Sequence, residues 1–230
     1  MTLSFENPPH TLVYDGGSTR FIMQLARASD APALVEAIDE SLPELLKFMP
    51  WSHLRQTVES QRERLTGIET ERADGGDVTY HLFSERGGDF IGCLGLHRRT
   101  MNPNAFEIGY WIRTSRAGHG LATLATQCTI VMGFECLGVE RIQCVYNEGN
   151  TASGRVIQKA GFGEEGHHPF FEQRPTDEMR ANGCVMEPSA VMNALFPEDR
   201  DRLEWYAGVC SALTVLDKDG AAVWAGTGRE

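Results

Sequence analysis

The sequence lacks the features that would place a protein in a membrane or outside the cell. None of its apolar stretches approaches the roughly 18 residues that a membrane span requires. The start, Met1 to Asp15, contains Glu6, two prolines and no basic cluster, so it does not resemble a signal peptide. We therefore expect a cytoplasmic protein that does not bind a membrane.

Paired cysteines and a surplus of basic side chains are also missing. The six cysteines include no C-x-x-C and no histidine partner at ligand spacing, so we expect small buried hydrophobic residues rather than disulfides or a metal site. The adjacent pair His167-His168 cannot point the same way in an extended chain, which also argues against a metal. A net charge of −11, from 21 basic and 32 acidic side chains, disfavours nucleic acid as a partner. It is compatible with a cationic or amine-bearing substrate, although solubility alone also explains it.

The sequence does contain enough apolar residues for an ordinary hydrophobic core, because 41% of its residues are apolar and 23% are charged. We expect one domain over residues 1–196, followed by a C-terminal extension over residues 197–230. The extension contains Trp205, Tyr206, Val215 and Trp224 and is too apolar to remain unpacked. It should pack on the domain or on a second subunit, which would make the protein a homodimer.

Hydrophobic periodicity predicts an α/β (α+β) fold with a central mixed sheet and helices on its faces. A helix after Ser29-Asp30 is expected to break at Pro43, and a second helix is expected to be capped by Ser52. The remaining elements up to the end of the domain are strands and helices. They are strands at 21–25, 78–84, 90–97, 105–113 and 141–146, helices from Gly120 to Gly138 and over 151–160, a final strand region after Gly161, a short helix within 175–183 and a strand at 190–196.

The segment Ala105 to Arg113 has a strict period of two. Phe106, Ile108, Tyr110 and Ile112 share one face, whereas Glu107, Trp111 and Arg113 share the other. This pattern predicts a strand with two chemically different faces.

A glycine-rich turn, Arg116-Ala-Gly-His-Gly-Leu-Ala122, follows that strand and opens a helix. Unpaired N–H groups at a helix N-terminus and the helix dipole together form a site for a pyrophosphate. A tight loop with no ligand remains the alternative. No Gly-Lys-Ser/Thr follows, and Thr123 stands where a dinucleotide-binding motif has its third glycine, so both of those phosphate loops are excluded.

A second motif, Asn147-Glu-Gly-Asn150-Thr-Ala-Ser153, lies between a strand and a helix. Asn150 or Thr151 can cap that helix, and Ser153 would then lie in its first turn, beside the end of the strand.

These motifs, in this order, resemble the GNAT acetyltransferase family, and more narrowly its branch of ribosomal-protein N-terminal acetyltransferases. The resemblance covers roughly residues 27–166 and depends on four segments: Glu-Ile-Gly-Tyr-Trp, Gly-His-Gly-Leu-Ala-Thr, Asn-x-x-Asn-x-x-Ser and Gly-Phe-x-x-Glu-Gly. It implies the GNAT fold, with a mostly antiparallel sheet, and transfer of an acetyl group from acetyl-CoA to a primary amine. The transfer would be direct, through a tetrahedral intermediate, with no metal.

The resemblance also implies roles for individual residues. The loop residues Gly118, His119, Gly120, Leu121 and Ala122 would bind the pyrophosphate of CoA, and Asn150 would contact the pantetheine arm. The strand end, Tyr110, Trp111, Ile112 and Arg113, would pair with that arm, and Ser153 would assist departure of the thiolate. The family usually has Arg or Gln where this chain has Ala117. Either Arg116 takes over that contact or CoA binds more weakly.

The reaction needs a base for the ammonium and an N–H donor for the oxyanion. Glu107, on the face of Trp111, and Glu165, in the Gly-Phe-x-x-Glu-Gly motif, are equal candidates for the base. A backbone N–H on the Trp111 strand would meet the oxyanion. Trp51, Phe170 and Phe171 are candidates for the wall of an acceptor pocket, although core packing is the expected role of Trp51.

Two questions stay open at this point. The acceptor could be a protein N-terminus or a small amine. The chain could also be a non-catalytic acyl-CoA-binding sensor or interaction domain, a reading supported by Ala117 and by the unfamiliar C-terminal extension.

Overall fold

The computed structural model describes residues 3–73, 76–86, 88–98 and 102–226. Its strands form one sheet of ten. The strands are β1 (Thr11–Asp15), β2 (Arg20–Leu25), β3 (Val78–Phe83), β4 (Phe90–His97), β5 (Ala105–Ile112), β6 (Arg141–Asn147), β7 (Gly163–His168), β8 (Ala190–Leu195), β9 (Leu213–Leu216) and β10 (Ala222–Ala225).

Six α-helices and four short 3-10 helices are found in the described ranges. The α-helices are α1 (Ala31–Leu45), α2 (Val58–Ala73), α3 (Leu121–Cys136), α4 (Thr151–Ala160), α5 (Asp177–Ala181) and α6 (Tyr206–Ala212). The 3-10 helices are η1 (Ala28–Asp30), η2 (Pro50–His53), η3 (Thr114–Arg116) and η4 (Pro197–Arg202). None of the helices in these ranges is long and apolar enough to cross a membrane.

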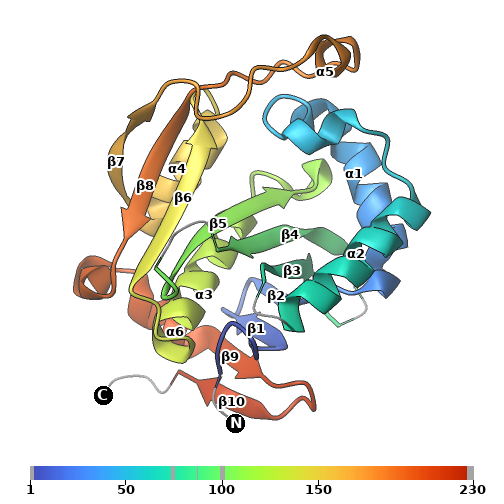
Figure 1. The fold of residues 1–230 in the computed structure, drawn as a ribbon. Coiled ribbons are helices and arrows are strands. Elements are labelled where there is room, and N and C mark those ends of the chain that lie inside the picture. Colours follow the sequence, from blue (N-terminus) through green and yellow to red (C-terminus); the bar gives the residue numbers. More distant parts are fainter. Residues whose placement is uncertain (1–2, 74–75, 87, 99–101, 227–230) are drawn as a thin grey trace.

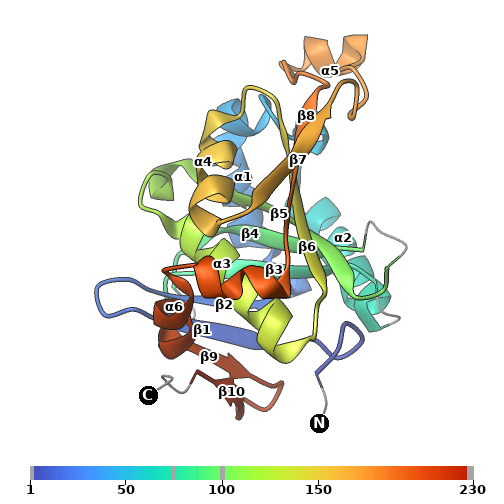
Figure 2. The same ribbon diagram turned by 90° about the vertical axis from the view of Figure 1, so that its left-hand side faces the viewer.

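The strand order is β10-β9-β1-β2-β3-β4-β5-β6-β8-β7. Every neighbouring pair is antiparallel except β5 and β6, which run parallel. The expected mixed, mostly antiparallel sheet flanked by helices is therefore confirmed (Figures 1 and 2).

Helices cover both faces of the sheet. On one face α3, α4 and α6 pack over a core that includes Phe106 and Ile108 of β5. On the other face α1 and α2 pack over a second core, and Trp111 contacts that core from β5. The period-two pattern of β5 therefore separates its side chains as predicted, with even-numbered residues on the α3/α4 face and odd-numbered residues on the α1/α2 face.

Two expectations for the first helices are wrong. Pro43 does not end α1, because it lies in the last turn, where loss of one N–H is outweighed by burial of Leu34, Ile38 and Leu45. Ser52 does not cap α2, because its hydroxyl donates to the carbonyl of Met49. The α2 cap is Thr57, whose Oγ1 accepts the N–H of Ser60 at 3.1 Å.

The C-terminal segment packs on this same sheet. β9 pairs with β1 in antiparallel register, and Leu213 and Val215 of β9 are buried. The Tyr206 hydroxyl of α6 donates to Glu135 of α3 at 2.9 Å. The hairpin of β9 and β10 thus extends the sheet at the edge away from β6, while residues 227–230 lie outside the described residues.

Candidate active site

An opening between β5 and β6 is the central feature of the site. The two strands pair only from Ala105↔Arg141 to Glu107↔Gln143. Beyond that point β5 stays paired with β4 as far as Ile112, and β6 stays paired with β8 as far as Asn147 (Figure 1). The parallel strands therefore diverge in the middle of the sheet.

Backbone groups of β5 line this opening. The N–H of Arg113 donates to Ile91 of β4 at 2.9 Å, and along an antiparallel strand the bonding direction alternates. The N–H groups of Trp111 and Gly109 consequently face β4, whereas those of Tyr110 and Ile112 face the opening. The oxyanion donor expected on this strand would thus come from Tyr110 or Ile112 rather than from Trp111.

The glycine-rich turn lies at the end of β5. Gly118 and Gly120 have φ of +81° and +76°, which a residue with a side chain rarely adopts. Both glycines are exposed, with open space where a Cβ would be, and Gly120 directly precedes α3. His119 is exposed beside them, and Leu121 and Ala122 form the first helical turn. Residues 118–122 thus present backbone N–H groups at a helix N-terminus, the arrangement that suits a pyrophosphate.

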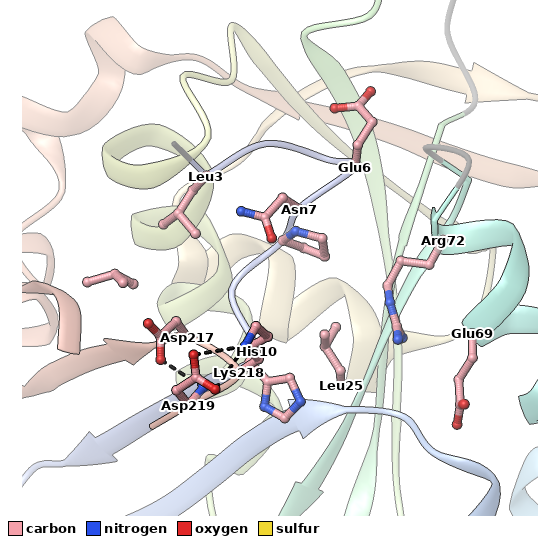
Figure 3. A pocket seen from close by; sticks show the side chains of 12 residues that line it. Leu3, Glu6, Asn7, His10, Leu25, Glu69, Arg72, Asp217, Lys218 and Asp219 are labelled. Carbon is pink, nitrogen blue, oxygen red and sulfur yellow. Dashed lines mark hydrogen bonds and ion pairs between the residues drawn. The ribbon is translucent and has the colours of Figure 1, made fainter. Parts of the chain in front are cut away.

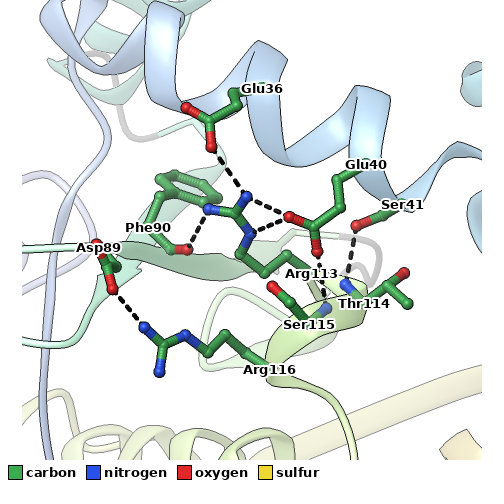
Figure 4. Close-up of polar contacts among 9 residues, drawn as sticks. All are labelled: Glu36, Glu40, Ser41, Asp89, Phe90, Arg113, Thr114, Ser115 and Arg116. Atoms are coloured by element: carbon green, nitrogen blue, oxygen red, sulfur yellow. Dashed lines mark hydrogen bonds and ion pairs between the residues drawn. The ribbon is translucent and has the colours of Figure 1, made fainter.

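Polar side chains of α1 hold the backbone segment that leads from β5 into this turn (Figure 4). Glu40 accepts the backbone N–H of Ser115 at 2.7 Å, and Ser41 Oγ accepts that of Thr114 at 3.0 Å. Glu40 also pairs with Arg113, and this hydrogen bond, together with that from Ser115, lowers the pKa of Glu40 to about 2. The Arg113 side chain is thereby turned towards α1, so any contact of this residue with CoA would come from its backbone.

Arg116, the candidate substitute for the missing Arg or Gln at Ala117, has its own partner. Its guanidinium pairs with Asp89, in the turn that precedes β4 (Figure 4). The side chain is 42% exposed, so it would have to exchange Asp89 for a phosphate.

A tyrosine and a serine meet on the α3/α4 side of the opening. The Tyr110 hydroxyl lies 2.9 Å from Ser153 Oγ and 3.3 Å from the Ser153 carbonyl. Burial raises the pKa of Tyr110 well above its usual range, so the phenol keeps its proton. Asn150 caps α4, accepting the N–H of Ser153 at 3.1 Å, and this bond fixes the position of Ser153. The pairing of Tyr110 with Ser153 was not expected from the sequence, because 43 residues separate them.

The two candidate bases belong to one chain of hydrogen bonds but have different surroundings. Gln143 Nε2 donates to Glu107 at 3.0 Å, and neighbouring Arg141 forms a two-bond ion pair with Glu165 at 2.7 and 2.5 Å. The Arg141 hydrogen bonds lower the pKa of Glu165, which weakens it as a base. Glu107 has no cationic partner within ion-pair distance among the described residues and lies directly beside the opening.

Aromatic side chains lie on the α1/α2 side. Trp51 is 37% exposed and its ring centroid lies 6.4 Å from that of Trp111, so its expected role in the core is wrong. Phe170 and Phe171, which follow β7, are also exposed. The segment between β7 and β8 reaches across to the end of α1, where the Val185 N–H donates to the Leu46 carbonyl at 3.3 Å.

A separate cavity of about 210 Å³ lies near the N-terminal segment, the end of α2 and the β9–β10 turn (Figure 3). Arg72 and Lys218 line it together with Glu69, Asp217 and Asp219, so its charges have both signs. None of the predicted site residues lines it, and it has no part in the site described here.

A glycine-rich turn at the end of a strand, beside an opening between two parallel strands, is the arrangement expected from the resemblance to GNAT acetyltransferases. Residues 20–163 match the family model described as "Acetyltransferase (GNAT) domain". The chain therefore belongs to the GNAT acetyltransferase family and is an N-acetyltransferase.

Ribosomal-protein acetyltransferases are among the similar proteins. The putative ribosomal N-acetyltransferase YdaF of Bacillus subtilis is 28% identical over 145 residues, 63% of this chain and 78% of the relative. The structure of Mycobacterium smegmatis RimJ with a CoA disulfide has a TM-score of 0.70 at 23% identity, over 83% of this chain and 89% of that chain. The structure of RimL, a ribosomal-protein α-N-acetyltransferase, with coenzyme A has a TM-score of 0.68 at 21% identity, over 80% and 97% of the two chains.

Proposed function

We propose that the protein transfers the acetyl group of acetyl-CoA directly to the α-amino group of a polypeptide N-terminus. The observation that carries this proposal is the opening between β5 and β6, with a half-buried Tyr110–Ser153 pair on one face and Glu107 on the other. The similarity to YdaF and RimL, both named as ribosomal acetyltransferases, supports a polypeptide rather than a small-molecule acceptor.

The chain's residues fit the donor. Residues 118–122 would hold the pyrophosphate through backbone N–H groups and the α3 dipole. The edge of β5 that faces the opening would pair with the amides of the pantetheine arm. The thioester would then lie between the two faces of the sheet, within reach of both.

Each face would supply one part of the reaction. On the α1/α2 face Glu107 would attract the acceptor's ammonium and assist its deprotonation. The N–H groups of Tyr110 and Ile112 would hold the carbonyl oxygen as it gains charge. On the α3/α4 face the Tyr110 phenol, oriented by Ser153, would donate its proton to the departing thiolate, since its raised pKa keeps it protonated.

Two measurements test this proposal. Calorimetric titration with acetyl-CoA, with NADH as the control, should give saturable binding that Gly120→Val weakens. Release of free thiol from acetyl-CoA should then depend on a peptide with a free N-terminus and disappear when that N-terminus is blocked. Saturable binding without thiol release for peptides or small amines would favour the non-catalytic sensor instead, and release with small amines alone would refute the polypeptide acceptor.

A further inference from the structure

A histidine that the sequence analysis passed over lies beside the opening. His97 ends β4 and is the cross-strand partner of Glu107, while the next pair on the same face of the sheet is Gly95↔Gly109. The ring leans back over these two glycines: a Cβ on Gly95 would lie 2.6 Å from His97 Nε2, and a Cβ on Gly109 would lie 3.3 Å from it. Two glycines side by side thus provide the space that the imidazole occupies.

The His97 ring lies on the α1/α2 face of the sheet, from which the acceptor would approach, and at the level of the opening. Gly109 lies just beyond Glu107, the last β5 residue that pairs with β6. Odd-numbered residues of β5 face α1 and α2, so Nε2 lies on the same face as Glu107 and Trp111. An amine that reaches the opening from this face would pass close to the imidazole.

A carboxylate determines which ring nitrogen of His97 carries the proton. His97 Nδ1 lies 2.7 Å from Asp77 Oδ2, and Asp77 Oδ1 accepts the backbone N–H of Arg98 at 2.9 Å. Because a carboxylate only accepts hydrogen bonds, the neutral ring carries its proton on Nδ1 and presents a lone pair at Nε2. Asp77 is its hydrogen-bond partner within the described part of the chain, and the His97 side chain is 29% exposed.

We propose that His97 is a catalytic residue whose Nε2 takes the proton that the acceptor ammonium must lose, while Glu107 holds the ammonium in place; this rests on the proposed function. The ammonium loses a first proton to Nε2, and the imidazolium, which keeps Nδ1–H on Asp77, passes that proton to solvent. The neutral amine then forms the N–C bond, and its nitrogen loses a second proton by the same route, which leaves the amide with one N–H. The C–S bond breaks, the thiolate takes its proton from Tyr110, and the phenolate is reprotonated from solvent. A neutral imidazole suits this step because its unprotonated ring nitrogen offers a lone pair to the proton.

The test compares His97→Gln with the wild type on peptides whose N-terminal amine becomes progressively less basic, from aminoacyl to hydrazino to aminobenzoyl. With the aminoacyl peptide we expect kcat to fall about 100-fold, the ordinary contribution of a general base. The loss should shrink steadily along the series, because a weakly basic amine needs no base. Asp77→Asn should give a smaller loss with the same trend, since the ring remains but its orientation is no longer fixed.

His10→Gln is the matched control, because His10 precedes β1, four strands away from β5. Its kinetics should equal those of the wild type, and acetyl-CoA affinity should be unchanged in all three variants. Nitrogen NMR of the imidazole should show the proton of neutral His97 on Nδ1.

The possible results separate the two proposals. An unchanged kcat in His97→Gln, an equal loss for every amine, or a proton on Nε2 would each overturn the role of His97 while leaving the proposed function intact. A folded wild type that releases no thiol with any amine would refute the proposed function, and the role of His97 with it.

Discussion

The sharpest prediction concerns the phenol of Tyr110. In the variant Tyr110→Phe the ring remains, so the packing of β5 against the core is kept and only the hydroxyl is lost. The lost hydrogen bond to Ser153 should lower the free energy of unfolding by about 1 kcal/mol. Loss of the proton donor should lower kcat about 100-fold, which corresponds to roughly 2.7 kcal/mol of transition-state free energy.

The assay is thiol release at saturating acetyl-CoA and peptide, with acetyl-CoA affinity measured separately by calorimetry. The affinity should change less than about twofold, because a proton donor to the leaving group contributes only in the transition state. The deficit should shrink when CoA is replaced by a donor with a less basic thiol, because that thiolate needs no protonation.

Tyr206→Phe provides the control, because its hydroxyl also forms a hydrogen bond, to Glu135 on α3, far from the opening. That variant should lose a comparable amount of stability and no activity. A Tyr110→Phe enzyme with kcat within about twofold of the wild type would refute the assignment of the phenol as the acid.

Three further predictions address the two carboxylates and the loop. Glu107→Gln should lower kcat at least 10-fold, because the acceptor's ammonium loses the carboxylate that holds it, while Glu165→Gln leaves kcat nearly unchanged. The opposite order in thiol-release kinetics would assign that role to Glu165. Because the pKa of Glu165 is lowered in the fold, its ion pair stabilises the protein above the unfolded value near 4.5 and is lost as the pH falls through the lowered pKa. Urea unfolding should therefore find Glu165→Gln less stable by about 0.5 kcal/mol at pH 7, a small figure because the pair is partly exposed, and this difference should disappear once the pH falls below the lowered pKa. Gly120→Val should weaken acetyl-CoA binding about 10-fold through the strain of its positive φ, whereas Gly208→Ala on α6, where a Cβ meets open space, should not.

Sequence signals within single segments were sufficient to predict much of the fold. The boundaries predicted for β4 and α4 are those of the structure, and β5 differs by one residue, because in each case period and capping signals lie within the segment itself. The strand β1 was missed, although β2 follows it in a hairpin and Gly16-Gly17 in the turn between them was a usable signal. Its other partner, β9, lies about 200 residues further along the chain, and that pairing could not be predicted from local sequence.

In the candidate site, too, contacts between distant segments could not be predicted from local sequence. The glycine-rich turn and the Asn150 cap could be recognised because each is contiguous. The Tyr110–Ser153 contact and the Asp77–His97 pair could not, because each joins segments that only the sheet register brings together. The alternation of Gly95 and His97 on one face of β4 was a usable signal for the position of the imidazole, though not for its partner Asp77, since a glycine two residues before a histidine leaves room for its ring to fold back.

In the proposed mechanism one strand, β5, divides the chemistry between two faces of the sheet. Tyr110 is even-numbered and contacts Ser153 of α4, whereas Glu107 and Trp111 are odd-numbered and face α1 and α2. In a continuous sheet these two sets would be separated by the backbone and could not act on one molecule. They can do so only because β6 leaves β5 after Glu107 and remains with β8 instead. A substitution that restored pairing between β5 and β6 would therefore abolish transfer without removing any of the reacting side chains.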